Sequence, residues 1–101
     1  MVKAEELLKI AKEHPGLPMI SMVDSEVVAD DCHSYWLGEV YRIDVDFINK
    51  DTDRVLIKSV DDEEDILYAF DSNWDDLPEA AQDKILADVK WEKAIILWIG
   101  V

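Results

Sequence analysis

The chain has little cysteine, glycine and proline for its 101 residues, and few positive charges. Its single cysteine, Cys32, cannot form an internal disulfide, which is typical of proteins in a reducing cytoplasm. Its three glycines build no phosphate-binding loop, nucleophile elbow or dinucleotide-binding motif. The sequence therefore indicates no cofactor, and we expect a protein that is not an enzyme.

Long hydrophobic runs are also missing. The longest, Ala94–Ile99, is far shorter than the roughly 20 residues that a membrane-spanning helix needs. The first residues, Met1–Ile10, alternate charged with apolar side chains and lack the apolar segment of a signal peptide. We therefore expect a cytoplasmic protein with no membrane contact, folded as one domain over residues 1–101.

Positive charge is the scarcest property of the chain. Ten lysines and arginines face 24 aspartates and glutamates, so the formal net charge is −14. No base lies between Lys12 and Arg42 or between Lys58 and Lys84, and these two segments hold sixteen of the 24 carboxylates. These segments argue against direct binding of nucleic acid, because lysine and arginine must neutralise the phosphates. The strong field of one sign favours a basic protein as the partner.

Hydrophobic periodicity predicts an α+β domain. We expect an N-terminal helix, an antiparallel sheet of about four or five strands, and two helices before a central C-terminal strand. The expected elements are a helix at 1–13, strands at 17–23, 26–29, 35–41, 43–48 and 54–60, helices beginning at 61 and 76, and a strand at 91–101.

The stretch from Asp61 to Asp76 has the most concentrated charge, with eight carboxylates and no base. Asp61 with Glu64, and Asp76 with Glu79, have the spacing of helix capping boxes. Five adjacent acids at 61–65 exceed what one helix end uses, and they repel one another. The predicted partner-binding residues are Asp61, Asp62, Glu63, Glu64, Asp65, Asp71, Trp74, Asp75 and Asp76.

Two alternatives to a binding surface stay open in this stretch. The acids can be an ordinary solvated face, and Trp74, predicted as an aromatic anchor, can instead cover the core beneath its loop. Residues 71–75 have the opening spacing of a calcium loop. However, the sixth and twelfth positions are Asp76 and Gln82 instead of glycine and glutamate, so we expect no metal site.

Asp44 and Asp46 lie two residues apart on a predicted strand, roughly 6.6 Å apart and comparable to the spacing of backbone phosphates. A row of such carboxylates can occupy cation sites meant for DNA. The simpler interpretation is an exposed strand face whose acids pair with Arg42, Arg54 or Lys58.

Short runs spread over most of the chain carry a resemblance. They are Leu17-Pro18-Met19, Met22-Val23, Glu26–Asp31, Tyr35–Gly38 and Trp91–Ile95. In these runs the chain resembles a family of small uncharacterised acidic proteins from phages and prophages of Gram-positive bacteria. The resemblance implies a mobile-element origin and a role against host defences, for example by imitating DNA. It implies no particular functional residue.

Together these observations predict a non-catalytic acidic binding protein, a phage-type inhibitor of the DNA-mimic, anti-CRISPR or anti-restriction kind. Its partner would be a basic host protein, a nucleic-acid-binding protein or a nuclease. Three alternatives stay open: an immunity protein against a nuclease toxin, a structural or assembly protein whose acidity only keeps it in solution, and a metal-dependent hydrolase. The sequence does not indicate the oligomeric state.

Overall fold

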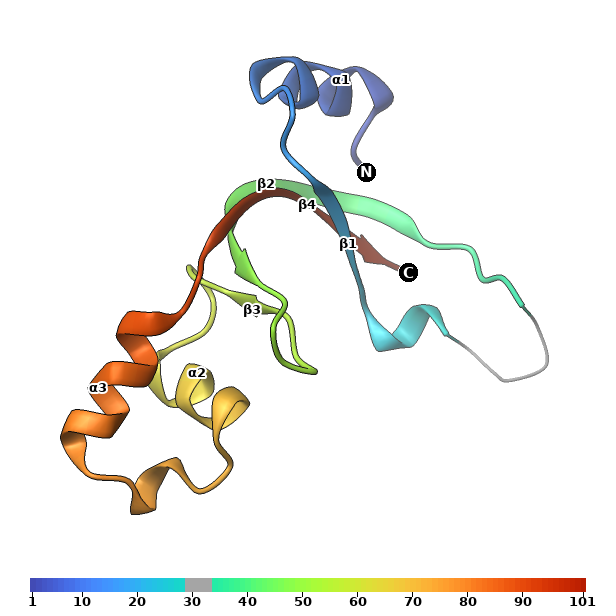
Figure 1. The fold of residues 1–101 in the computed structure, drawn as a ribbon. Coiled ribbons are helices and arrows are strands. Elements are labelled where there is room, and N and C mark those ends of the chain that lie inside the picture. Colours follow the sequence, from blue (N-terminus) through green and yellow to red (C-terminus); the bar gives the residue numbers. More distant parts are fainter. Residues whose placement is uncertain (29–33) are drawn as a thin grey trace. The chain divides into compact units, whose positions relative to one another are not determined.

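The computed structural model describes residues 1–28 and 34–101, and it confirms the α+β class (Figure 1). The elements are α1 (Ala4–Glu13), β1 (Met19–Val23), the 3₁₀ helix η1 (Ser25–Val27), β2 (Glu39–Asn49), β3 (Leu56–Ile57), α2 (Glu63–Phe70), the 3₁₀ helix η2 (Trp74–Asp76), α3 (Glu79–Asp88) and β4 (Glu92–Gly100). Cys32 lies outside the described residues, as does residue 29 at the end of the strand expected at 26–29.

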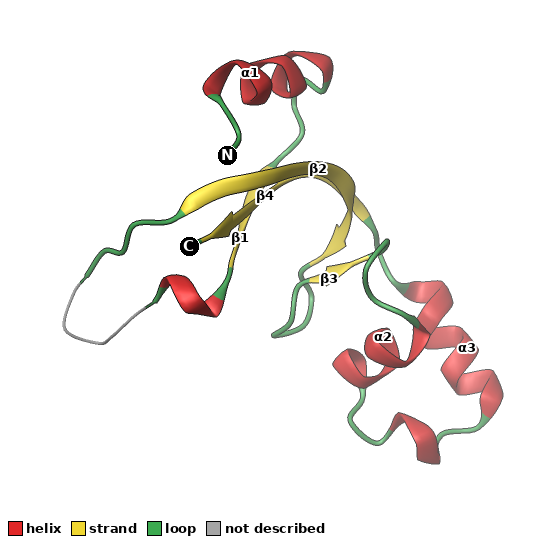
Figure 2. Ribbon diagram, turned by 180° about the vertical axis from the view of Figure 1, so that it is seen from behind, coloured by secondary structure: helices red, strands yellow, loops and turns green. Residues whose placement is uncertain are grey.

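The four strands form one sheet in the order β1-β4-β2-β3 (Figure 2). The C-terminal strand β4 therefore lies inside the sheet, as its apolar run predicted. The sheet is mixed and not purely antiparallel: β2 and β3 are antiparallel, whereas β1 and β4 are parallel, with Met19 opposite Ile95. Parallel pairing is possible because the whole middle of the chain separates β1 from β4 and leaves room for a crossover.

The contacts of the chain group into two compact units, where the sequence suggested one domain. Unit 1 holds residues 1–45 and 94–101, and unit 2 holds residues 46–93. Each unit has its own buried side chains. In unit 1 the buried hydrophobic residues are Val27, Ala94, Ile95 and Ile96. In unit 2 they are Ile48, Leu56, Ile57, Ile66 and Leu67.

Two strands expected in unit 1 differ from the prediction. The return strand expected at 26–29 is wrong over its described residues 26–28, because the chain forms η1 at Ser25–Val27, where the Val27 amide donates to the Asp24 carbonyl (3.0 Å). The strand expected at 35–41 begins only at Glu39, and Tyr35 before it is 91% exposed. Gly38 permits a close approach to β4, because a Cβ there would lie 2.7 Å from Cγ2 of Ile99.

The hairpin in unit 2 is shorter than predicted. The strand expected at 54–60 is only Leu56–Ile57, because the amides of Val60 and Asp61 both donate to the Ile57 carbonyl and turn the chain. Two neighbouring residues near the end of β2 differ in burial. Phe47 is 41% exposed, whereas Ile48 is fully buried opposite Ile57. The ammonium of Lys58 lies 5.4 Å from the centre of the Phe47 ring.

Candidate functional site

All nine predicted partner-binding residues lie in unit 2: Asp61 and Asp62 directly before α2, and the others on α2 or on the connection from α2 to α3. The structure divides them by what their side chains already contact. Some carboxylates are used inside the unit, and others are exposed without an internal role. This division decides which residues can meet a partner.

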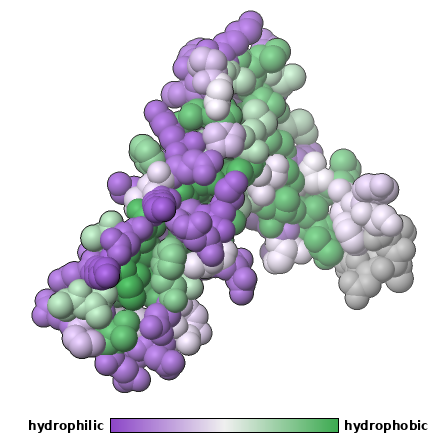
Figure 3. Space-filling view, viewed as in Figure 1, coloured by the Kyte–Doolittle hydropathy of each residue, from purple (hydrophilic) through white to green (hydrophobic). Residues whose placement is uncertain are grey.

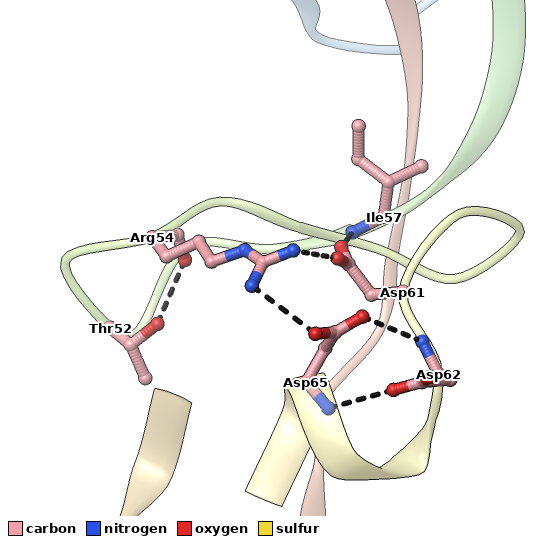
Figure 4. A network of polar contacts seen from close by, with 6 residues as sticks. All are labelled: Thr52, Arg54, Ile57, Asp61, Asp62 and Asp65. Atoms are coloured by element: carbon pink, nitrogen blue, oxygen red, sulfur yellow. Dashed lines mark hydrogen bonds and ion pairs between the residues drawn. The ribbon is translucent and has the colours of Figure 1, made fainter. Parts of the chain in front are cut away.

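Asp61 belongs to the interior. Its side chain is only 4% exposed; it accepts a hydrogen bond from the Ile57 amide (2.7 Å) and pairs with the guanidinium of Arg54 (Figure 4). The predictions that Asp61 caps the helix and lies on a binding surface are therefore wrong. A carboxylate enclosed in this way stabilises the turn after β3 and cannot reach a partner.

Asp62 and Asp65 form the capping box of α2, one residue later than predicted. The Asp65 amide donates to Oδ1 of Asp62 (2.9 Å), and the Asp62 amide donates to Oδ2 of Asp65 (3.3 Å) (Figure 4). Asp65 also lies 3.6 Å from Nη1 of Arg54, so one guanidinium faces two carboxylates. Part of the acidic run is thus explained by the start of the helix.

Four of the predicted acids have no such role. Glu63 and Glu64 are exposed on the first turn of α2, and Asp75 and Asp76 are exposed on η2. Within residues 1–28 and 34–101, no hydrogen bond to these four side chains and no ion pair with them is found. We call these four residues the free acids. Among the nine predicted residues, they are the carboxylates available to an external cation.

The connection between α2 and α3 is ordered by its own hydrogen bonds. Asp71 ends α2 and accepts from the Asn73 amide (2.9 Å). The side-chain Nε2 of Gln82 donates to the backbone carbonyls of Trp74 (3.1 Å) and Leu77 (3.0 Å). Trp74 itself is half-buried at the start of η2. This burial leaves part of the residue on the surface, as an anchor requires, and part of it covered.

The capping box predicted for the second helix is wrong. Asp76 lies inside η2, and α3 begins at Glu79 with Pro78 in the N-cap position, which makes no side-chain cap. Proline suits the start of a helix because its missing amide is not needed there. Asp76 is exposed in η2.

Asp44 and Asp46 of β2 both have contacts within the chain. Asp44 accepts from the indole Nε1 of Trp98 (2.8 Å) and pairs with Nε of Arg42 (2.7 Å). Asp46 accepts from the hydroxyl of Ser59 and from the Phe47 amide. The structure therefore supports the simpler interpretation of these residues as part of an ordinary strand face.

The sequence did not predict a groove between α2 and α3, which contact each other side by side. It has a volume of about 410 Å³ and is lined by Phe70, Asp71, Ala81, Lys84, Ile85, Asp88 and Val89. In the lower left of Figure 3, where these helices lie, purple hydrophilic residues surround green hydrophobic ones. The available signal in the sequence was the apolar spacing of Ala81, Ile85 and Val89, which are half-buried in the structure.

Unit 2 carries most of the excess charge. Its 48 residues include fifteen aspartates and glutamates and six lysines and arginines, a formal net charge of −9 out of −14. In the described part of the chain, no three histidine, cysteine or acidic side chains are placed to hold a metal ion. No helix among the same residues is long and apolar enough to span a membrane.

In comparisons with known proteins, the chain matches no family model, and no curated protein or solved structure shows significant similarity to it.

Proposed function

We propose that this chain is a non-catalytic acidic binding protein that occupies the basic surface of a nucleic-acid-binding protein or nuclease. The observation that carries the proposal is the set of free acids Glu63, Glu64, Asp75 and Asp76, exposed in a unit with a net charge of −9. In the same proposal the protein is phage-encoded, acts in the host cytoplasm and inhibits its partner.

The free acids support this function because, within the described residues, their carboxylates make no hydrogen bond or ion pair. Arg54 is the cation that the acidic run uses, and it faces Asp61 and Asp65. Exposed carboxylates without a cation of their own gain most from the lysines and arginines of a partner. Their combined field also raises the rate of encounter with a basic surface, and salt weakens it.

The proposal is tested by neutralising the free acids together. The variant Glu63→Gln, Glu64→Gln, Asp75→Asn and Asp76→Asn removes four charges without touching the Arg54 network. A matched control removes four charges from exposed acids of unit 1, by Glu5→Gln, Glu6→Gln, Glu13→Gln and Glu26→Gln. Both variants have the same net charge, so only the position of the charge differs.

Each protein is immobilised and exposed to a bacterial lysate at about 0.15 M and about 1 M salt, where charges are screened beyond about 8 Å and about 3 Å. Wild type and control are expected to retain basic nucleic-acid-binding proteins at the lower salt only. Duplex DNA should release them, because it competes for the same cations. If the free-acid variant retains the same proteins as the control, the proposed surface is refuted.

A further inference from the structure

We propose that the groove between α2 and α3 binds the apolar face of a basic amphipathic helix on the partner. This inference rests on the proposed function and specifies its partner more closely. It assigns the apolar contacts to the groove and the ionic contacts to the acids of the same unit.

The apolar part of the groove is a stripe on α3 facing the end of α2. Ala81, Ile85 and Val89 recur every four residues and are half-buried, and Phe70 on α2 is 38% exposed. None of the ten residues of α3 is buried. Apolar side chains at this spacing are the contacts by which a groove receives a second helix with its own anchors at every third or fourth position.

Charge selects the occupant. The groove is flanked by the carboxylates of Asp71 and Asp88 and by one ammonium, that of Lys84, whose long side chain is exposed and free to turn toward solvent. A second copy of this chain would bring another unit with a net charge of −9 against the first. That repulsion disfavours self-association and favours a helix with lysine or arginine beside its apolar face.

Two synthetic peptides with equal numbers of lysines test this inference. The first peptide has leucines at every third or fourth position and lysines at the others, which is the pattern of an amphipathic helix. The second peptide is oligolysine. Wild-type protein is expected to bind the leucine–lysine peptide at least about tenfold more tightly, because burying one leucine side chain corresponds to such a ratio. The variant Ile85→Asn should bind both peptides equally. The control Ala87→Asn, at an exposed position of α3 outside the groove, should behave as wild type.

The outcomes separate the two proposals. If both peptides bind wild type equally and with the same salt dependence, the groove is refuted and the acidic surface stands. If neither binds at low salt, the proposed function fails and the groove proposal fails with it. If Ile85→Asn still binds the leucine–lysine peptide more tightly than oligolysine, the proposal that the groove binds this peptide is also refuted.

A second measurement does not depend on any variant folding. In wild-type protein labelled with ¹⁵N, the leucine–lysine peptide should shift the amide signals of Phe70, Ala81, Ile85 and Val89 more than those of α1. Shifts that are largest outside α2 and α3 would overturn the assignment of the groove.

Discussion

Replacing Asp61 by alanine should destabilise the protein by about 1.5–4 kcal/mol. The Ile57 amide would lose an acceptor that is charged and buried, and hydrogen bonds to charged groups contribute about 1.5–3 kcal/mol. The ion pair adds less, about 0–1 kcal/mol, because the side chain of Arg54 is 52% exposed and screened by solvent. A loss of this size is a large part of the 5–15 kcal/mol by which small domains are folded.

Urea unfolding followed by circular dichroism measures the effect. Asp61→Asn should lose less than Asp61→Ala, because an amide oxygen still accepts from the Ile57 amide. Glu63→Ala is the matched control, an exposed acid two residues along the chain, and it should change stability by no more than about 0.5 kcal/mol. The dependence of unfolding free energy on urea should stay constant, which identifies the change as one of stability.

The reasoning is refuted if Asp61→Ala and Glu63→Ala unfold at the same urea concentration. The carboxylate of Asp61 would then contribute nothing to the turn after β3. A binding assay adds a second criterion. Asp61→Asn should bind basic partners as wild type does under conditions in which it is folded, because its side chain is only 4% exposed.

Three smaller effects follow from other contacts. Asp62→Ala should lower stability by about 1 kcal/mol through loss of the α2 cap, measured as a fall in melting temperature of about 4–8 °C. Asp44→Ala should cost about 1–3 kcal/mol in urea unfolding, because it leaves the Trp98 indole without its acceptor, and it should leave partner binding unchanged. Gln82→Ala should speed hydrogen exchange at residues 74–77 while exchange in the sheet stays as in wild type, since two carbonyls of that turn lose their donor.

Periodicity was a sufficient guide for several elements. The stripe of the first helix predicted residues 1–13, and α1 spans Ala4–Glu13. The apolar run near the C-terminus predicted a strand inside the sheet, and β4 has that place. The helix prediction succeeds because apolar residues spaced three or four apart favour an amphipathic helix, although no residue of α1 is buried. The strand prediction succeeds because a strand inside a sheet, covered on both faces, favours an unbroken apolar run.

The predictions that were wrong depend on specific hydrogen bonds and ion pairs, which hydrophobic periodicity does not indicate. The strand expected at 54–60 ends at Ile57, because the Ile57 carbonyl accepts hydrogen bonds from the amides of Val60 and Asp61 and the chain turns there. The helix cap moved from Asp61 to Asp62, because Arg54 and the Ile57 amide together take the first carboxylate. Neighbouring aspartates are equivalent in a sequence, and only their surroundings distinguish them.

The sequence by itself determined the sign and size of the charge and its concentration between Asp61 and Asp76, because charge follows directly from the order of the residues. Only the tertiary structure decided which carboxylates remain available. A carboxylate is free or used according to the cation or amide that folding places within about 3 Å of it. By that criterion Asp61 belongs to the interior, and Glu63, Glu64, Asp75 and Asp76 belong to the surface.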